Sequence, residues 1–163
     1  MGLDMYLNAH KYIGGNFDHL GITGKISIER QPKSFNGGED GEKTTLLELD
    51  DMSKVSKIIF HVGYWRKANQ IHSWFVENCQ EDKDECQEAW VSVEQLEELR
   101  DLCQEVKDTK DASLLEPVSG FFFGSTEVDE WYWQDIDETI KILTEALNNP
   151  LFEDCSFYYQ SSW

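Results

Sequence analysis

Four consecutive residues, Tyr64, Trp65, Arg66 and Lys67, place two aromatic rings beside two positive charges. They lie within residues 52–76, a stretch without Asp or Glu in a chain of 163 residues that contains 32 acids. An aromatic plane next to a guanidinium can stack on a nucleobase while the charge meets a phosphate. We therefore predict that Tyr64 or Trp65 stacks on a base and that Arg66 and Lys67 bind phosphate.

A helix is expected directly after this segment, because apolar residues recur with helical spacing from Ala68 to Cys79. The free amides at the start of a helix favour anions, and Asn69 and His72 would then read the polar edges of a ligand. The alternative is structural: residues 58–62 form a buried strand, His72 is a core histidine, and the neighbouring Trp and Arg are a packing anchor and an ion-pair donor. The sequence leaves both interpretations open.

A second candidate segment covers residues 120–127. Three phenylalanines between glycines indicate a buried strand at residues 121–123. Gly124, Ser125 and Thr126 then indicate a turn whose amides and hydroxyls can hold an anion ahead of the next helix. This turn is not a phosphate loop of the GxxxxGK[ST] type, because the lysine is absent.

Residues 131–133 are Trp, Tyr and Trp. Their three rings cannot all face one core, so at least one is exposed or lies at an interface. We include Trp133 among the candidate ligand-binding residues. The surplus of aromatic residues also favours a homo-oligomer in which subunits share pockets.

No combination of residues requires a catalytic centre. Asp129, Glu130 and Asp135 with His61 or His72 could be assembled into a metal hydrolase, but acids are so frequent in this chain that such groupings arise by chance. The four cysteines match neither a paired CxxC zinc pattern nor a disulfide framework, so we expect reduced thiols. We predict no catalytic residue, no metal and no cofactor.

The formal net charge of −18 argues against direct binding to nucleic acids or anionic membranes, which requires Lys and Arg to displace counterions. It favours either simple solubility or imitation of a polyanion, in which acidic helices at residues 92–108 and 129–147 would occupy the basic site of a nucleic-acid enzyme. No apolar run is long enough to span a membrane, and the N-terminus lacks a secretory signal. We expect a protein that stays in the compartment where it is made.

The elements that position these residues belong to a small α+β fold. Period-two alternation predicts strands at residues 2–8 and 25–29. Residues 57–62 are β-rich and predict a further strand or extended segment that runs into a turn at Gly63 and Tyr64. Helical periodicity predicts helices at residues 68–79, 92–108 and 129–147.

Ser92 and Gln95 form a capping box at the start of the second helix. Residues 157–159 would add a final edge strand, and residues 31–43 would form a mobile loop. We expect a single domain, residues 1–163, in which a small mixed or antiparallel sheet is packed by about three helices over a single core.

Three segments are distinctive together: MGLDMYL at residues 1–7, VGYWRKAN at residues 62–69 followed by Ile71 and His72, and GFFFGSTE at residues 120–127. In this order they resemble a group of small, uncharacterised proteins encoded by tailed bacteriophages. The resemblance implies phage origin and a location in the host cytoplasm. It supplies no assigned active site that could be carried over.

For such a phage protein, the candidate segments suggest an accessory role against host defence. The protein would bind a host immune signalling nucleotide, such as a cyclic nucleotide, and sequester it without cleaving it; this is an analogy of context and chemistry. Two alternatives remain. One is an acidic protein-binding inhibitor or nucleic-acid mimic acting on a host enzyme, and the other is a phosphodiesterase that degrades the nucleotide.

Overall fold

The computed structural model describes residues 2–13, 26–30, 44–49, 55–120 and 123–163. The chain groups into two compact units, one formed by Met1–Lys11 with Ile59–Trp163 and the other by Tyr12–Ile58. The hydrophobic core cluster of the described residues lies within the larger unit. Both candidate segments, residues 64–72 and 124–126, belong to this unit as well.

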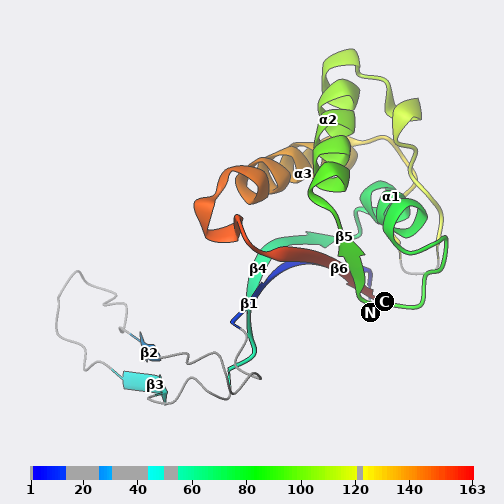
Figure 1. Cartoon of the computed structure of the whole chain (residues 1–163). Coiled ribbons are helices and arrows are strands. Elements are labelled where there is room, and N and C mark those ends of the chain that lie inside the picture. The colour runs from blue at the N-terminus through cyan, green and yellow to red at the C-terminus, as the bar shows by residue number, and fades with distance from the viewer. Residues whose placement is uncertain (1, 14–25, 31–43, 50–54, 121–122) are drawn as a thin grey trace, which may run out of the picture. The chain divides into compact units, whose positions relative to one another are not determined.

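The described part of the larger unit is built on a four-stranded antiparallel sheet with the strand order β4-β1-β6-β5 (Figure 1). The strands are β1 (Asp4–Tyr12), β4 (Lys57–Arg66), β5 (Ala89–Val91) and β6 (Ser156–Ser162). Alternate side chains of β1, including Met5 and Leu7, are fully buried, as the period-two spacing predicts. The predicted α+β class is confirmed.

Three α-helices of the described residues lie on the same side of this sheet: α1 (Asn69–Cys79), α2 (Val93–Thr109) and α3 (Glu130–Asn148) (Figure 1). Short 3-10 helices, η2 (Ala112–Leu114) and η3 (Pro150–Phe152), follow α2 and α3. The capping box at the start of α2 is confirmed, with Ser92 Oγ accepting from the Gln95 amide at 3.1 Å and Gln95 Oε1 accepting from the Ser92 amide at 2.9 Å. None of the helices in the described ranges has the length and apolar character needed to cross a membrane.

β6 is a central strand, so the edge position that we predicted for residues 157–159 is wrong. It pairs with β1 on one side and with β5 on the other, and Tyr159 lies opposite Leu7 and Ala89. The alternating aromatic residues of β6 identify a strand but carry no information about its neighbours. β5 has only three residues, which is too short for a period-two pattern to be recognised.

β4 continues through Gly63 as far as Arg66, where the sequence had indicated a turn. A Cβ atom on Gly63 would lie 2.6 Å from Ile142 Cγ2 and 3.1 Å from Trp65 Cη2. Glycine at this position therefore allows α3 and the Trp65 ring to pack tightly against the strand. The chain changes direction only at Lys67, which has a positive φ of 64°.

The smaller unit contains β2 (Ile26–Arg30) and β3 (Thr44–Leu49), which pair in antiparallel fashion with a register shift between Ile28 and Glu29. The strand predicted at residues 25–29 corresponds to β2. The loop predicted at residues 31–43 lies outside the described residues.

Candidate ligand-binding site

A cavity of about 340 Å³ lies where the turn between β4 and α1 meets the chain that leads into α3. The β4–α1 segment contributes Arg66, Lys67, Asn69 and Gln70. The later segment contributes Pro117, Gly124, Ser125, Glu127, Asp129, Trp131, Tyr132 and Asp135. The structure thus brings together the two segments that the sequence had singled out separately.

The backbone of Lys67 forms one corner of this cavity. Its positive φ is uncommon for a residue with a side chain, and it is held by a hydrogen bond from the Lys67 amide to the Leu3 carbonyl at 2.8 Å. Gly124, with φ of +92°, packs so closely that an added Cβ would lie 3.3 Å from Lys67 Cβ. A Cβ on Gly2 would lie 3.3 Å from Lys67 Cε. Two glycines therefore leave the space through which the lysine side chain runs.

Asn69 fastens the later segment to the start of α1. Its side chain is 2% exposed, and Nδ2 donates to the carbonyls of Phe123 at 3.1 Å and Ser125 at 2.8 Å. Its Oδ1 accepts from the Val118 amide at 2.9 Å. Both amide protons are thus used within the protein. Asn69 shapes the cavity, whereas we had predicted that it reads a ligand edge.

Residues 124–126, for which we predicted a turn, belong to the same segment and lie in neither a helix nor a strand. Ser125 Oγ accepts from the Glu127 amide at 3.0 Å, a local bond typical of serine in turns. Of the strand predicted at residues 121–123, Phe123 alone is described, and it belongs to no strand. The Phe123 ring packs edge-on against His72, with 4.9 Å between the ring centroids.

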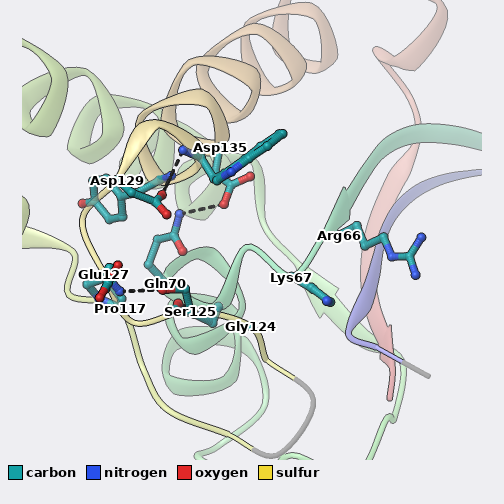
Figure 2. Close-up of a pocket in the computed structure, with 12 residues that line it drawn as sticks. Arg66, Lys67, Gln70, Pro117, Gly124, Ser125, Glu127, Asp129 and Asp135 are labelled. Carbon is teal, nitrogen blue, oxygen red and sulfur yellow. Dashed lines mark hydrogen bonds between the residues drawn. The ribbon is translucent and has the colours of Figure 1, made fainter.

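The interior of the cavity is acidic and rich in hydrogen-bond acceptors. Asp135 is half-buried, and Gln70 Nε2, from a side chain that is 2% exposed, donates to Asp135 Oδ2 at 3.2 Å (Figure 2). Burial raises the pKa of Asp135 to about 6, with smaller contributions from Glu138 and Asp129, while the Gln70 hydrogen bond acts in the opposite direction. Asp129 is the N-cap of α3 and accepts from two backbone amides of its first turn.

Arg66 and Lys67 form a basic edge on another side of the cavity. Figure 2 shows both side chains directed away from the carboxylates of Asp129 and Asp135. The Arg66 side chain is 63% exposed and its Nε lies 3.9 Å from Asp4 Oδ1, a distance at which an exposed pair contributes little. Two cations thus line one edge of a cavity whose other walls carry three carboxylates.

Trp65 and His72 lie in the core and do not line the cavity. Trp65 is 2% exposed and its Nε1 donates to Thr139 Oγ1 at 2.9 Å. His72 is 1% exposed, with Nδ1 2.7 Å from the Tyr159 hydroxyl and Nε2 3.0 Å from Asp84 Oδ2. Both residues match the structural alternative, and neither ring is accessible to a ligand in this structure.

Tyr64, Thr126 and Trp133 are also outside the cavity wall. Tyr64 is half-exposed and donates to Asp4 Oδ1, and this hydrogen bond raises the pKa of the Tyr64 phenol. Thr126 is exposed. Trp133 is half-buried beneath Lys110, whose Nζ lies 4.6 Å from the ring centroid.

Trp131 provides the aromatic wall that the sequence had assigned elsewhere. It is 71% exposed and lies four residues before Asp135, on the same face of α3. Trp131, Asp135 and Gln70 were not among the predicted binding residues. The four-residue spacing of Trp131 and Asp135, and the position of Gln70 directly after Asn69, were the signals in the sequence that pointed to them.

Among the described residues, no group of three His, Cys, Asp or Glu side chains could hold a metal ion. Comparison with protein-family models, curated proteins and solved structures gave no match.

Proposed function

We propose that this cavity binds a nucleotide-like ligand and that the protein holds the ligand without cleaving it. The observation that carries the proposal is the juxtaposition of an exposed indole, a half-buried carboxylate and a basic edge around one cavity. Trp131 would stack on the base, Asp135 would accept hydrogen bonds from the base edge, and Arg66 with Lys67 would meet the phosphate. A nucleotide is a ligand class with all three matching parts.

The sizes and energies are compatible with useful affinity. A cavity of about 340 Å³ lies at the small end of the range for ligand pockets, roughly 300–1,000 Å³. Stacking of a base on an aromatic side chain contributes about 1–3 kcal/mol, and hydrogen bonds to charged groups contribute about 1.5–3 kcal/mol each.

The charge distribution limits the number of phosphates. The cavity is lined by two cations and three carboxylates, in a protein with a net charge of −18. Each further phosphate would meet repulsion without an additional cation. A ligand with one phosphate for each bound base therefore fits better than a triphosphate.

The arrangement favours holding over hydrolysis. A carboxyl group with a pKa of about 6 can exchange protons near neutral pH, and Asp135 is such a group. However, Figure 2 shows it away from Arg66 and Lys67, which would hold the phosphate. In this orientation Asp135 meets the base and not the phosphoryl group. In the host cytoplasm of a phage infection, such binding would sequester an immune signalling nucleotide.

A direct experiment incubates the purified protein with a panel of mononucleotides and of cyclic and linear dinucleotides, removes free ligand, denatures the protein by heat and identifies what is released. Intact ligand supports the proposal, whereas cleaved products would support the phosphodiesterase alternative. No retained ligand from the whole panel would defeat nucleotide binding.

The double variant Arg66→Ala/Lys67→Ala provides the residue-level test in this experiment. We expect it to lose about tenfold or more in affinity, because two charge-assisted contacts to phosphate are removed. Lys141→Ala is the matched control, since Lys141 is an exposed cation of α3 that does not line the cavity. Equal losses in both variants would indicate a nonspecific charge effect.

The acidic-inhibitor alternative has an observation of its own. Exposed carboxylates follow one another along α2 at spacings of three and four residues, which forms a continuous stripe: Glu94, Glu98, Asp101, Glu105 and Asp108. Salt-sensitive binding to a basic host enzyme that persists in Arg66→Ala would favour this function.

A further inference from the structure

The position of the Asp135 carboxylate in the cavity determines which nucleotide base can bind there. This inference rests on the proposed nucleotide binding. Asp135 and Trp131 lie one helical turn apart on the same face of α3, so a ring that stacks on the indole has its edge near the carboxylate. Gln70 approaches the carboxylate from α1 and fixes its orientation by donating to Oδ2.

The carboxylate retains capacity for a ligand. An ionised carboxylate has two oxygens with about four acceptor positions. The Gln70 amide uses one of these, and none of the described residues donates a hydrogen bond to Oδ1. Because Gln70 is 2% exposed and packed in the protein, this arrangement exists before the ligand arrives.

A carboxylate matches a base edge that presents two neighbouring N–H donors. Guanine has such an edge, formed by a ring N–H and the adjacent amino group. Adenine places an acceptor nitrogen beside its amino group, uracil has one N–H between two carbonyls, and neutral cytosine has an acceptor beside its amino group. Against these edges the half-buried carboxylate would face a lone pair, which is costly when water is excluded.

We infer that the cavity selects guanine nucleotides, with the Asp135 carboxylate accepting from the ring N–H and the amino group of guanine while the ring stacks on Trp131. A guanidinium group presents the same pair of parallel donors, so free arginine is the competing source of this chemistry. The basic edge of Arg66 and Lys67 favours the nucleotide, because it matches a phosphate and repels the arginine side chain.

The test measures affinities by calorimetry for GMP, IMP, AMP and free arginine with the unmodified protein. IMP lacks the amino group but keeps the ring N–H. We expect GMP to bind at least about tenfold more tightly than AMP, with the affinity of IMP between the two. The reason is that a bidentate contact discriminates between the matching and the wrong base by about 1–3 kcal/mol. Equal affinities for GMP and AMP would overturn guanine selection and leave nucleotide binding intact.

Asp135→Asn tests the assignment to this residue. An amide presents one acceptor and one donor, so it matches xanthine, in which a carbonyl replaces the amino group of guanine. We expect the variant to lose GMP affinity and gain XMP affinity, while Glu145→Gln, an exposed acid-to-amide change on the same helix, leaves GMP affinity unchanged. An unchanged guanine preference in Asp135→Asn would refute the role of Asp135.

The remaining outcomes separate the two proposals. A nucleotide of the panel that binds while GMP does not would overturn guanine selection alone. If no mononucleotide or dinucleotide of the panel binds, the proposed function fails, and guanine selection fails with it. Binding of arginine without nucleotides has the same consequence and assigns Asp135 to a guanidinium group. The comparison of GMP, IMP and AMP requires no variant, so guanine selection stays testable even if Asp135→Asn does not fold.

Discussion

Replacing Asn69 by alanine removes three hydrogen bonds that fasten residues 118–125 to the start of α1. The side chain donates to the carbonyls of Phe123 and Ser125 and accepts from the Val118 amide. Each such bond contributes about 1 kcal/mol net, and the backbone groups left behind are only part-buried, so water can replace some of the loss. We therefore expect the free energy of unfolding to fall by about 2–3 kcal/mol.

Urea denaturation followed by circular dichroism measures this change. The matched control is Asn78→Ala on the same helix, because Asn78 is exposed and, within the described ranges, its side chain makes one hydrogen bond, to the Trp74 carbonyl at 2.8 Å. We expect that control to lose less than about 0.5 kcal/mol. A loss for Asn69→Ala as small as that for Asn78→Ala would refute the claim that Asn69 organises the cavity.

Three further predictions concern Asp135, Trp65 and Gly124. Burial raises the pKa of Asp135 in the folded protein to about 6, above its unfolded value, so its contribution to stability is present at low pH and is lost as the pH rises through 6. The effect of Asp135→Asn on the free energy of unfolding, measured by urea denaturation, should therefore be more stabilising at pH 7 than at pH 5 by about 1–2 kcal/mol. An effect that is the same at both pH values would contradict the raised pKa. Trp65→Phe removes the hydrogen bond to Thr139 and part of a buried ring, so urea denaturation should show the free energy of unfolding reduced by about 1–3 kcal/mol, with the affinity for GMP unchanged. An unchanged free energy of unfolding with a reduced affinity for GMP would instead place Trp65 at the ligand. Gly124→Ala places a side chain on a residue with positive φ beside Lys67, so we expect thermal denaturation to show the free energy of unfolding reduced by about 1–2 kcal/mol. A stabilised variant would contradict the close packing of Gly124 against Lys67.

The elements that the sequence predicted well are those whose signal is local. The capping box and the apolar stripes of α2 and α3 are spaced along a single segment, and β1 shows its alternation directly. The central place of β6 and the existence of β5 depend on pairing between distant segments. No local pattern contains that information, which is why both were missed.

The same distinction explains which parts of the candidate site were predicted. The acid-free stretch correctly indicated an unusual segment, but burial of Trp65 in β4 depends on the packing of α3 against Gly63. Neighbouring helical residues face different directions, so Trp131 and Trp133 cannot be ranked without knowing which face of α3 meets the core. Gln70 and Asp135 come together only through the contact between α1 and α3.

Trp131 and Asp135 form the wall of the cavity that we propose binds a nucleotide base. Calorimetric titration of Trp131→Ala and Trp133→Ala with GMP separates base stacking from a general effect of indole loss, because both variants remove an indole from the same helix and, of the two, Trp131 alone lines the cavity. We predict that Trp131→Ala loses about tenfold or more in affinity, consistent with a stacking contribution of about 1–3 kcal/mol, and that Trp133→Ala retains it. Loss of binding in Trp133→Ala with full affinity in Trp131→Ala would contradict the claim.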